Sequence, residues 1–216
     1  MLFRSVTVTL PADRYVKDGT VVAGTRTIPV VVKEQLVQKA EALCKEKPIV
    51  RVLPMPSKRV HLVVTGSEVF TGRIKDGFGP VVTKKVTDLG SRLESVKLAP
   101  DDPEVIAGNI KQAKEAGADV ILVSGGMSVD PDDKTPEGIR RSGAAVETHG
   151  FPVLPGSMFL MAYLGDTPVM GLSGCVLHDP FTALDALLPR LLAGERVTRA
   201  EIMAMGHGGL QRKHDH

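Results

Sequence analysis

From Lys58 onward, short apolar runs alternate with longer amphipathic segments, and this alternation constrains the fold more than any other feature of the chain. The apolar runs are too short for helices and are predicted strands, at residues 60–64, 93–98, 120–123, 145–148 and 169–172. Helices are predicted between them, at residues 80–89, 103–116 and 181–192 and from Pro136. This order predicts a three-layer α/β/α fold with a mostly parallel sheet and right-handed crossovers.

The pattern differs before a proline-rich break near residues 54–58. Strands are predicted there at residues 5–10, 20–23, 27–32 and 49–53, and one amphipathic helix at residues 33–45. About fifty residues of this kind can hardly hold a core alone, so we expect them to pack on the rest of the chain. The predicted organisation is a small, β-rich α+β subdomain over residues 1–57, a main domain over 58–195, and a tail over 196–216.

Composition excludes several classes of function. A formal net charge of +2 with 4% aromatic residues gives no basic, aromatic-lined surface for nucleic acid. No apolar run reaches the ~18 residues of a membrane span, and the alternation of residues 6–10 is unlike a signal peptide. The two distant cysteines, Cys44 and Cys175, suit a reducing compartment, so we expect a cytoplasmic protein with no membrane partner.

Three of the predicted strands end in the same way, with a hydroxyl residue followed by glycine. The three endings are Thr65-Gly66-Ser67-Glu68, Ser124-Gly125-Gly126 and Ser173-Gly174-Cys175. One such pair marks an ordinary turn in most proteins. Three at the carboxyl ends of parallel strands would converge on one crevice, which is where open α/β sheets bind ligands.

The middle strand end carries the strongest signal. Gly125 and Gly126 would let the backbone approach a ligand closely, and Thr135 and Pro136 are predicted as the cap and first residue of a helix that directs its N–H groups at the turn. Such backbone binds anions, and carboxylates beside it suit a divalent cation. The segment therefore predicts a phosphorylated ligand held together with Mg²⁺.

The carboxylates of this segment differ in their expected roles. Asp130, and to a lesser degree Asp132, can be explained as part of a solvated turn. Asp133 lies nearest the predicted helix, so it is the expected catalytic or metal-ligating residue, with Asp132 as the other candidate ligand. Glu68 at the first strand end would be the second catalytic carboxylate, although a plain surface glutamate is the simpler alternative.

Cys175 and His178 invite a comparison with cysteine nucleophiles, because Cys175 would lie near a predicted helix start. No third partner can be named from the sequence. A small structural cysteine is the favoured interpretation.

At these residues the chain resembles the molybdenum cofactor biosynthesis domain, shared by molybdopterin adenylyltransferases and molybdopterin molybdenumtransferases. The resemblance covers residues 58–193. Thr65-Gly66-Ser67-Glu68 resembles the Thr-Gly-Asp-Glu of the molybdenumtransferases, and the segment from Ser124 to Val129 resembles their Ser-Gly-Gly-Val-Ser-Val. Asp133-Lys134-Thr135-Pro136-Glu137 is similar to the Asp-Val-Thr-Pro-Glu of the adenylyltransferases.

The resemblance implies molybdopterin or its adenylate as ligand, Mg²⁺ and ATP as co-reactants, molybdate as a further candidate, and a homo-oligomer, either dimer or trimer. The reaction would be adenylyl transfer or metal insertion, with Asp133 and Glu68 as catalytic residues. The implied ligand-binding residues are Thr65, Gly66, Ser67, Ser124, Gly125, Gly126, Met127, Ser128, Pro155, Gly156, Ser173 and Gly174.

Two turns depart from the pattern of the family. Pro155-Gly156-Ser157 lacks the lysine of a Pro-Gly-Lys-Pro loop, and Ser173-Gly174-Cys175 lacks the proline and asparagine of Gly-Leu-Pro-Gly-Asn. A transferase of molybdenum cofactor biosynthesis is the preferred interpretation, and the missing lysine and asparagine favour one alternative, a carrier or sensor that binds pterin without turnover. A further alternative is a nucleotide pyrophosphatase resembling the competence-damage-inducible family, with which the segment 132–135 is compatible.

Overall fold

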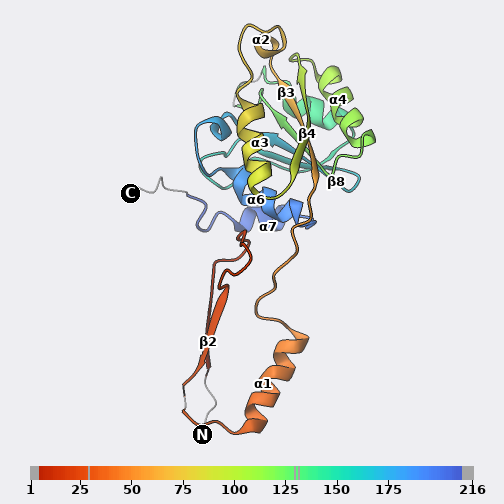
Figure 1. Ribbon diagram of the computed structural model, residues 1–216. Coiled ribbons are helices and arrows are strands. Elements are labelled where there is room, and N and C mark those ends of the chain that lie inside the picture. The colour runs from red at the N-terminus through yellow and green to blue at the C-terminus, as the bar shows by residue number, and fades with distance from the viewer. Residues whose placement is uncertain (1–4, 29, 129, 131, 211–216) are drawn as a thin grey trace. The chain divides into compact units, whose positions relative to one another are not determined.

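A computed structural model describes residues 5–28, 30–128, 130 and 132–210 (Figure 1). The chain divides into an N-terminal unit, Met1–Pro54, and a C-terminal unit, Met55–His216. Val129 of the glycine-rich motif and the histidines of the last six residues lie outside the described residues.

The C-terminal unit is built on a six-stranded sheet in the order β4-β3-β5-β8-β7-β6. Strands β4, β3, β5 and β8 are parallel, and only β7 runs against its neighbours. The predicted mostly parallel sheet is therefore confirmed. Its strands are β3 (Arg59–Thr65), β4 (Arg92–Ala99), β5 (Val120–Ser124), β6 (Ala145–His149), β7 (Leu160–Leu164) and β8 (Thr167–Leu172).

Helices cover both faces of this sheet, which completes the predicted three layers (Figure 1). One buried cluster joins β3 and β5 to α6 through residues such as Leu62, Leu122 and Leu184. The other joins β5 to α4 and α5 through Ile121, Ile110 and Ile139. The central strands read as continuous apolar runs because both of their faces are covered. The helices are α2 (Ser67–Phe70), α3 (Phe78–Asp88), α4 (Pro103–Glu115), α5 (Thr135–Arg141), α6 (Ala183–Leu192) and α7 (Arg199–Ala204), with a 3₁₀ turn η1 (Gly174–Leu177).

The boundaries of α4 follow from its end residues as predicted. The side chain of Asp102 accepts hydrogen bonds from the backbone N–H groups of Glu104, at 2.8 Å, and Val105, at 3.4 Å. Pro103 opens the helix, and Gly117 beyond its end has a φ of 82°. This cap satisfies two of the helix's four unpaired N–H groups.

The predicted start of α5 was wrong by one residue. Lys134 is the N-cap and makes no side-chain cap bond, whereas Thr135 is the first helical residue and is fully buried. The hydroxyl of Thr135 lies 2.9 Å from that of Thr65 and is thereby used in packing against β3. Tertiary contact overrides local cap preference at this position.

Residues 197–210, expected in a C-terminal tail, belong to the C-terminal unit. Thr198 and Glu201 form a capping box at the start of α7, and the buried side chains of Val197 and Ile202 join the core. The hydroxyl of Tyr163 donates to the backbone carbonyl of Val197 and accepts from its N–H at 2.8 Å. Across the described residues, no helix has the length and apolar character needed to cross a membrane.

The N-terminal unit contains a two-stranded antiparallel sheet, β1 (Ser5–Thr9) and β2 (Ala23–Thr27), and one helix, α1 (Glu34–Glu46). The small α+β subdomain is thus present, with fewer strands than predicted. The single strand β2 replaces the two expected at residues 20–23 and 27–32, and the described residues 49–53 form no strand. Strand propensity alone does not make a strand where no partner strand pairs with it.

Candidate functional site

Three strand ends meet at one edge of the sheet, as the recurrent sequence pattern predicted. The register aligns Val64 of β3 with Ser124 of β5, and Ser124 with Leu172 of β8. Thr65-Gly66, Gly125-Gly126 and Ser173-Gly174 therefore follow one another across neighbouring parallel strands. The chain folds this way because each strand is a buried apolar run that stops at a residue able to turn.

Thr65 and Gly125 pack directly on each other at this edge. The Thr65 hydroxyl donates to the carbonyl of Ser124 at 3.0 Å and contacts the hydroxyl of Thr135. A Cβ atom added to Gly125 would lie 2.2 Å from the Thr65 carbonyl oxygen, and Gly125 has a φ of 89°. Only glycine fits here, because both the space and the backbone conformation exclude a side chain.

The turn after β5 is held by its own acidic residues. The carboxylate of Asp133 accepts a short hydrogen bond from the Ser128 N–H, and the Asp133 N–H donates to the carbonyl of Asp130 at 3.1 Å. The Asp130 side chain in turn accepts from the Asp132 N–H at 2.9 Å. Asp130 is thus an Asx-type turn residue, as the simpler interpretation held, and Asp133 folds back over the turn that precedes it.

The predicted metal ligands have different surroundings. Asp132 is exposed and Asp133 is half-buried. Within the described residues, no group of three or more His, Cys, Asp or Glu side chains is arranged to hold a metal ion. Any cation held by Asp133 and Asp132 would therefore take its remaining ligands from a bound phosphate or from water, which is how Mg²⁺ commonly binds.

Asp101 is a site residue that the sequence reasoning missed. It follows β4, and its carboxylate accepts a hydrogen bond from the Ser67 N–H at 2.8 Å, while its own N–H donates to the Ser67 hydroxyl at 3.4 Å. This reciprocal pair ties the end of β4 to the turn after β3. The position of Asp101 directly after a parallel strand is a signal that could have identified it. The turn after β4 differs from the other three, because it has a proline where they have glycine.

Glu68 lies on the short exposed helix α2, next to Ser67. Its backbone carbonyl accepts from the N–H groups of Arg73 and Ile74, which closes the loop after α2. None of Glu68, Asp101 and Asp133 forms an ion pair with a basic side chain among the described residues. This edge of the sheet therefore presents carboxylates that no described basic side chain engages in an ion pair.

Two predicted ligand-binding residues are occupied by packing. The Met127 side chain is buried, and its terminal methyl lies 2.9 Å from the Cβ position of Gly171, so only its backbone is left to face a ligand. Gly156, with a φ of 114°, lies against the start of α6, where an added Cβ would be 3.0 Å from the Ala183 N. Pro155 and Gly156 precede β7, whose first residue pairs with Gly171, so they lie at the same edge of the sheet.

The third strand end is partly buried. Ser173 is 5% exposed and its carbonyl accepts from the Val176 N–H, whereas Gly174 is exposed. Cys175 is half-buried in η1, and its carbonyl accepts from the N–H of His178. This backbone bond holds the turn. The thiol itself has no hydrogen-bond or ion-pair partner within the described part of the chain.

Ser124 is the one described residue of this edge with an unpaired buried hydroxyl. Its side chain is 0% exposed, and its Oγ has no hydrogen-bond partner within the described residues. A second such atom, Nε2 of His61, lies in the middle of β3, where burial lowers the histidine's pKa and Nδ1 is 2.8 Å from the Ser95 hydroxyl. Buried polar atoms without partners are rare and call for an explanation.

Comparison with known proteins agrees with this arrangement. Residues 61–193 match the sequence profile of the family described as "Probable molybdopterin binding domain". The chain belongs to this molybdenum cofactor biosynthesis domain family. The matched segment contains every strand of the six-stranded sheet in whole or nearly so, together with the three strand-end turns.

Curated relatives include a CinA-like protein of Mycobacterium leprae, 38% identical over 85 residues, which are 39% of this chain and 20% of that protein. A CinA-like protein of Mycobacterium tuberculosis is 36% identical over the same length. The chain thus matches about a fifth of the length of these relatives. The similarity is confined to one segment of much larger proteins.

Two solved structures share the fold. The molybdopterin biosynthesis enzyme MoaB from Thermus thermophilus matches with a TM-score of 0.52 and 22% identity, over 64% of this chain and 98% of that one. The protein CinA from Thermoplasma acidophilum, of unknown function, matches with a TM-score of 0.55 and 18% identity, over 62% and 98%. At these identities the likeness concerns the α/β architecture alone.

Proposed function

We propose that this chain binds molybdopterin or its adenylate at the edge where β3, β5 and β8 end, and that it acts in molybdenum cofactor biosynthesis. The observation that carries this proposal is the close packing of Gly125 on Thr65, which leaves bare backbone at the centre of the edge in a chain of the molybdopterin-binding family. Glycine backbone at a strand end can approach a phosphate closely. Gly66 after β3, Gly126 beside Gly125 and Gly174 after β8 would add further glycine backbone to the same binding surface.

Mg²⁺ fits the residues of this edge by its chemistry. Carboxylate oxygens are the ligands it prefers, and one or two of them together with substrate phosphate are its usual coordination. Asp133 and Asp132 would hold the ion. When bound, it would neutralise charge on the phosphate beside the carboxylates of Glu68 and Asp101, which form no ion pair among the described residues.

The residues of the chain then have defined tasks. Asp101 and Asp133 each accept a backbone N–H and so fix the turns that would contact the ligand. The unpaired Ser124 hydroxyl lies directly under this edge and would gain a partner if ligand or ordered water reached it. Adenylyl transfer and metal insertion both require positioning and charge neutralisation, and no covalent nucleophile on the protein.

The test is adenylylation of molybdopterin with ATP and Mg²⁺, measured for the wild type and for Asp133→Asn. The amide keeps the volume and can still accept from Ser128 N–H, so the turn should persist while the charge is lost. We expect turnover by the wild type and at least a tenfold loss in Asp133→Asn. Asp166→Asn, in the exposed turn between β7 and β8, is the matched control and should keep full activity.

Molybdate-dependent metal insertion into the adenylate is the second reaction to assay with the same variants. Turnover of the adenylate with molybdate, without adenylylation of molybdopterin by ATP, would identify metal insertion as the reaction of this protein. Pterin binding without turnover in either assay would contradict the catalytic proposal. It would favour a carrier or sensor, consistent with the missing lysine after Gly156.

A nucleotide pyrophosphatase is the second candidate function, and the match to CinA-like proteins favours it. It would use the same carboxylates on a nucleotide pyrophosphate in place of a pterin phosphate. Hydrolysis of ADP-ribose or a nicotinamide nucleotide that exceeds any activity on molybdopterin, and that Asp133→Asn abolishes, would decide for this candidate. Absence of binding to any of these ligands would contradict both proposals.

A further inference from the structure

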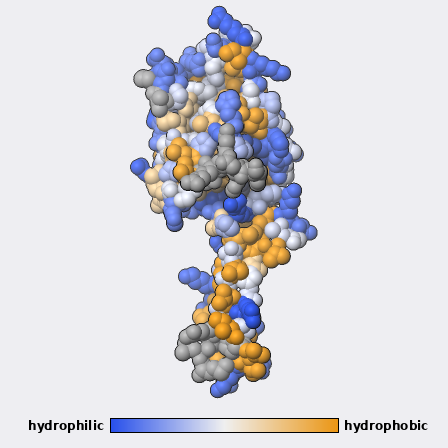
Figure 2. Space-filling model, turned by 90° about the vertical axis from the view of Figure 1, so that its left-hand side faces the viewer, coloured by the Kyte–Doolittle hydropathy of each residue, from blue (hydrophilic) through white to orange (hydrophobic). Residues whose placement is uncertain are grey.

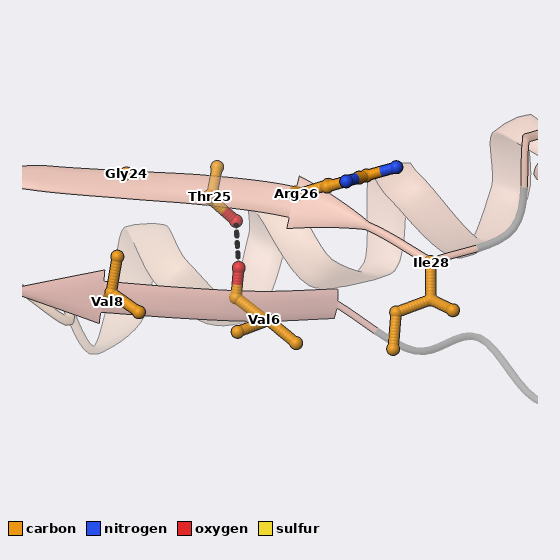
Figure 3. Close-up of a pocket in the computed structure, with 6 residues that line it drawn as sticks. All are labelled: Val6, Val8, Gly24, Thr25, Arg26 and Ile28. Carbon is orange, nitrogen blue, oxygen red and sulfur yellow. Dashed lines mark hydrogen bonds between the residues drawn. The ribbon is translucent and has the colours of Figure 1, made fainter.

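The N-terminal ribbon of β1 and β2 has two chemically different faces. Residues paired across an antiparallel ribbon share a face, and Val6 pairs with Arg26 while Val8 pairs with Gly24. Ile28 continues this face, and Figure 3 shows these residues among those that line an open pocket. The opposite face carries hydroxyl side chains, namely Ser5, Thr7, Thr9, Thr25 and Thr27.

No described residue of the N-terminal unit is buried. Val8 of β1 is 64% exposed, Ile28 beyond β2 is 57% exposed, and Leu43 on the apolar stripe of α1 is 67% exposed. On the face drawn in Figure 2, apolar side chains gather over this unit. A two-stranded hairpin is marginally stable in water unless more strands or a helix cover its apolar face.

Many apolar side chains of the N-terminal unit are exposed. Eleven Val, Leu and Ile side chains of the N-terminal unit are at least 41% exposed. With on the order of 100 Å² for each fully exposed side chain, they offer roughly 700 Å² per chain.

The edge of β1 that faces away from β2 can accept another strand. The Leu10 N–H donates to the carbonyl of Val22 at 3.0 Å. In an antiparallel strand the backbone N–H and C=O groups of alternate residues point to the same side, so those of Val8 and Val6 also point toward β2. Thr7 and its flanking hydroxyl residues therefore direct their N–H and C=O groups away from β2. Within the described residues, β1 pairs on one side only.

The β1 sequence is self-complementary. Ser5-Val6-Thr7-Val8-Thr9 reads nearly the same in both directions about Thr7. Two antiparallel copies centred on Thr7 place Val6 opposite Val8 on the apolar face and Ser5 opposite Thr9. A two-fold interface requires this property, because the same patch must fit itself. Centring β2 on Thr25 would instead place Arg26 beside Gly24.

We propose that two copies of this chain associate through β1, forming one four-stranded sheet in the order β2-β1-β1-β2. The valine face of each ribbon then continues across the two-fold axis, and the outward N–H and C=O groups of both β1 strands are paired. The occupant of this surface is thus a second copy. The N-terminal unit serves as the association module of the protein.

The test measures the mass of the full chain by light scattering over a dilution series, for the wild type, Thr7→Pro and Thr25→Pro. Both substitutions remove an outward N–H and the same Thr7–Thr25 side-chain contact at 3.1 Å. Thr25→Pro also removes the hydrogen bond from the Thr25 hydroxyl to the Val6 carbonyl at 3.2 Å, so it disturbs the hairpin at least as much as Thr7→Pro while it leaves the β1 edge open. We expect a wild-type dimer, an equal dimer for Thr25→Pro, and dissociation of Thr7→Pro at concentrations at least tenfold higher. A monomeric wild type, as would result if the C-terminal unit or a different protein covered this face, would overturn the proposal, as would equal masses for the two proline variants.

A second measurement guards against disruption of the hairpin by proline. In a Cys44→Ala background, Thr7→Cys brings two thiols together across the proposed axis, whereas Thr25→Cys does not. Oxidation with diamide should link Thr7→Cys chains covalently at least tenfold faster than Thr25→Cys chains. Equal rates would contradict pairing through β1.

Discussion

Replacing Gly125 by alanine tests the packing at the centre of the proposed site. The new Cβ would lie 2.2 Å from the carbonyl oxygen and 2.7 Å from the hydroxyl oxygen of Thr65, and the residue would keep a φ of 89°. The carbonyl belongs to the backbone of the last residue of β3, which pairs with Ala99 of β4, and it cannot rotate away. We expect about 1–3 kcal/mol from the backbone conformation and a further ~1–3 kcal/mol from overpacking.

Alanine variants of two other glycines distinguish the cost of the backbone conformation from the cost of overpacking. Gly150 has a φ of 100° but open space around its Cβ position, so alanine there should cost only the conformational part, about 1–3 kcal/mol. Gly174 has open space and an ordinary φ, so Gly174→Ala should leave stability within about 0.5 kcal/mol of the wild type.

The assay is urea unfolding followed by far-ultraviolet circular dichroism, with melting temperature as a second measure. Gly125→Ala should be less stable than Gly150→Ala by about 2 kcal/mol, or roughly 4–8 °C in Tm for a domain of this size. If Gly125→Ala proves as stable as Gly150→Ala, the turn after β5 does not rest on Thr65 as described. The argument that only bare backbone fits there would then fail.

Three further predictions concern buried polar atoms. Thr65→Val removes the hydrogen bond to Ser124 O and leaves the Thr135 hydroxyl without its partner, so urea unfolding should show a loss of about 1–3 kcal/mol; a loss below about 0.5 kcal/mol would contradict this. Ser124→Ala deletes an unpaired hydroxyl and should leave stability unchanged or slightly higher, while weakening binding of molybdopterin in titration calorimetry; a stability loss above about 1 kcal/mol would show an undetected partner. Because burial lowers the pKa of His61 below 6.5, the unfolded chain takes up its proton first, and stability is lost as pH falls below about 6.5. Urea midpoints at about pH 7.5 and about pH 5.5 should therefore differ more for the wild type than for His61→Asn, and equal differences would rule out this contribution.

The sequence was sufficient for the parallel part of the sheet because each central strand is a short run of apolar residues between turn signals. β7 was missed, since Leu160-Met161-Ala162 lacks the β-branched residues that mark strands and the turn at Gly165-Asp166 was overlooked. The start of α7 could have been read from the capping box of Thr198 and Glu201. The sequence thus contains local signals for both β7 and the start of α7. Neither element fits the regular alternation of strand and helix on which the predicted fold depends.

The candidate site was predictable in its strand ends and not in its side-chain contacts. A shared motif at three parallel strands indicates where ligand would bind, but it does not say that Met127 turns into the core or that Thr135 bonds to Thr65. Asp101 shows the same limit, since its role depends on Ser67, 34 residues earlier in the chain. Such contacts are set by packing between distant segments, which periodicity and caps do not encode.

The most direct test is a crystal structure of the chain with bound molybdopterin, at a concentration where titration calorimetry shows one site. We predict the terminal phosphate at the edge formed by β3, β5 and β8, within hydrogen-bonding distance of the backbone at Gly125-Gly126 or Gly174 and beside Asp133. A phosphate bound elsewhere on the protein, or a chain that binds no molybdopterin at all, would contradict the proposed function.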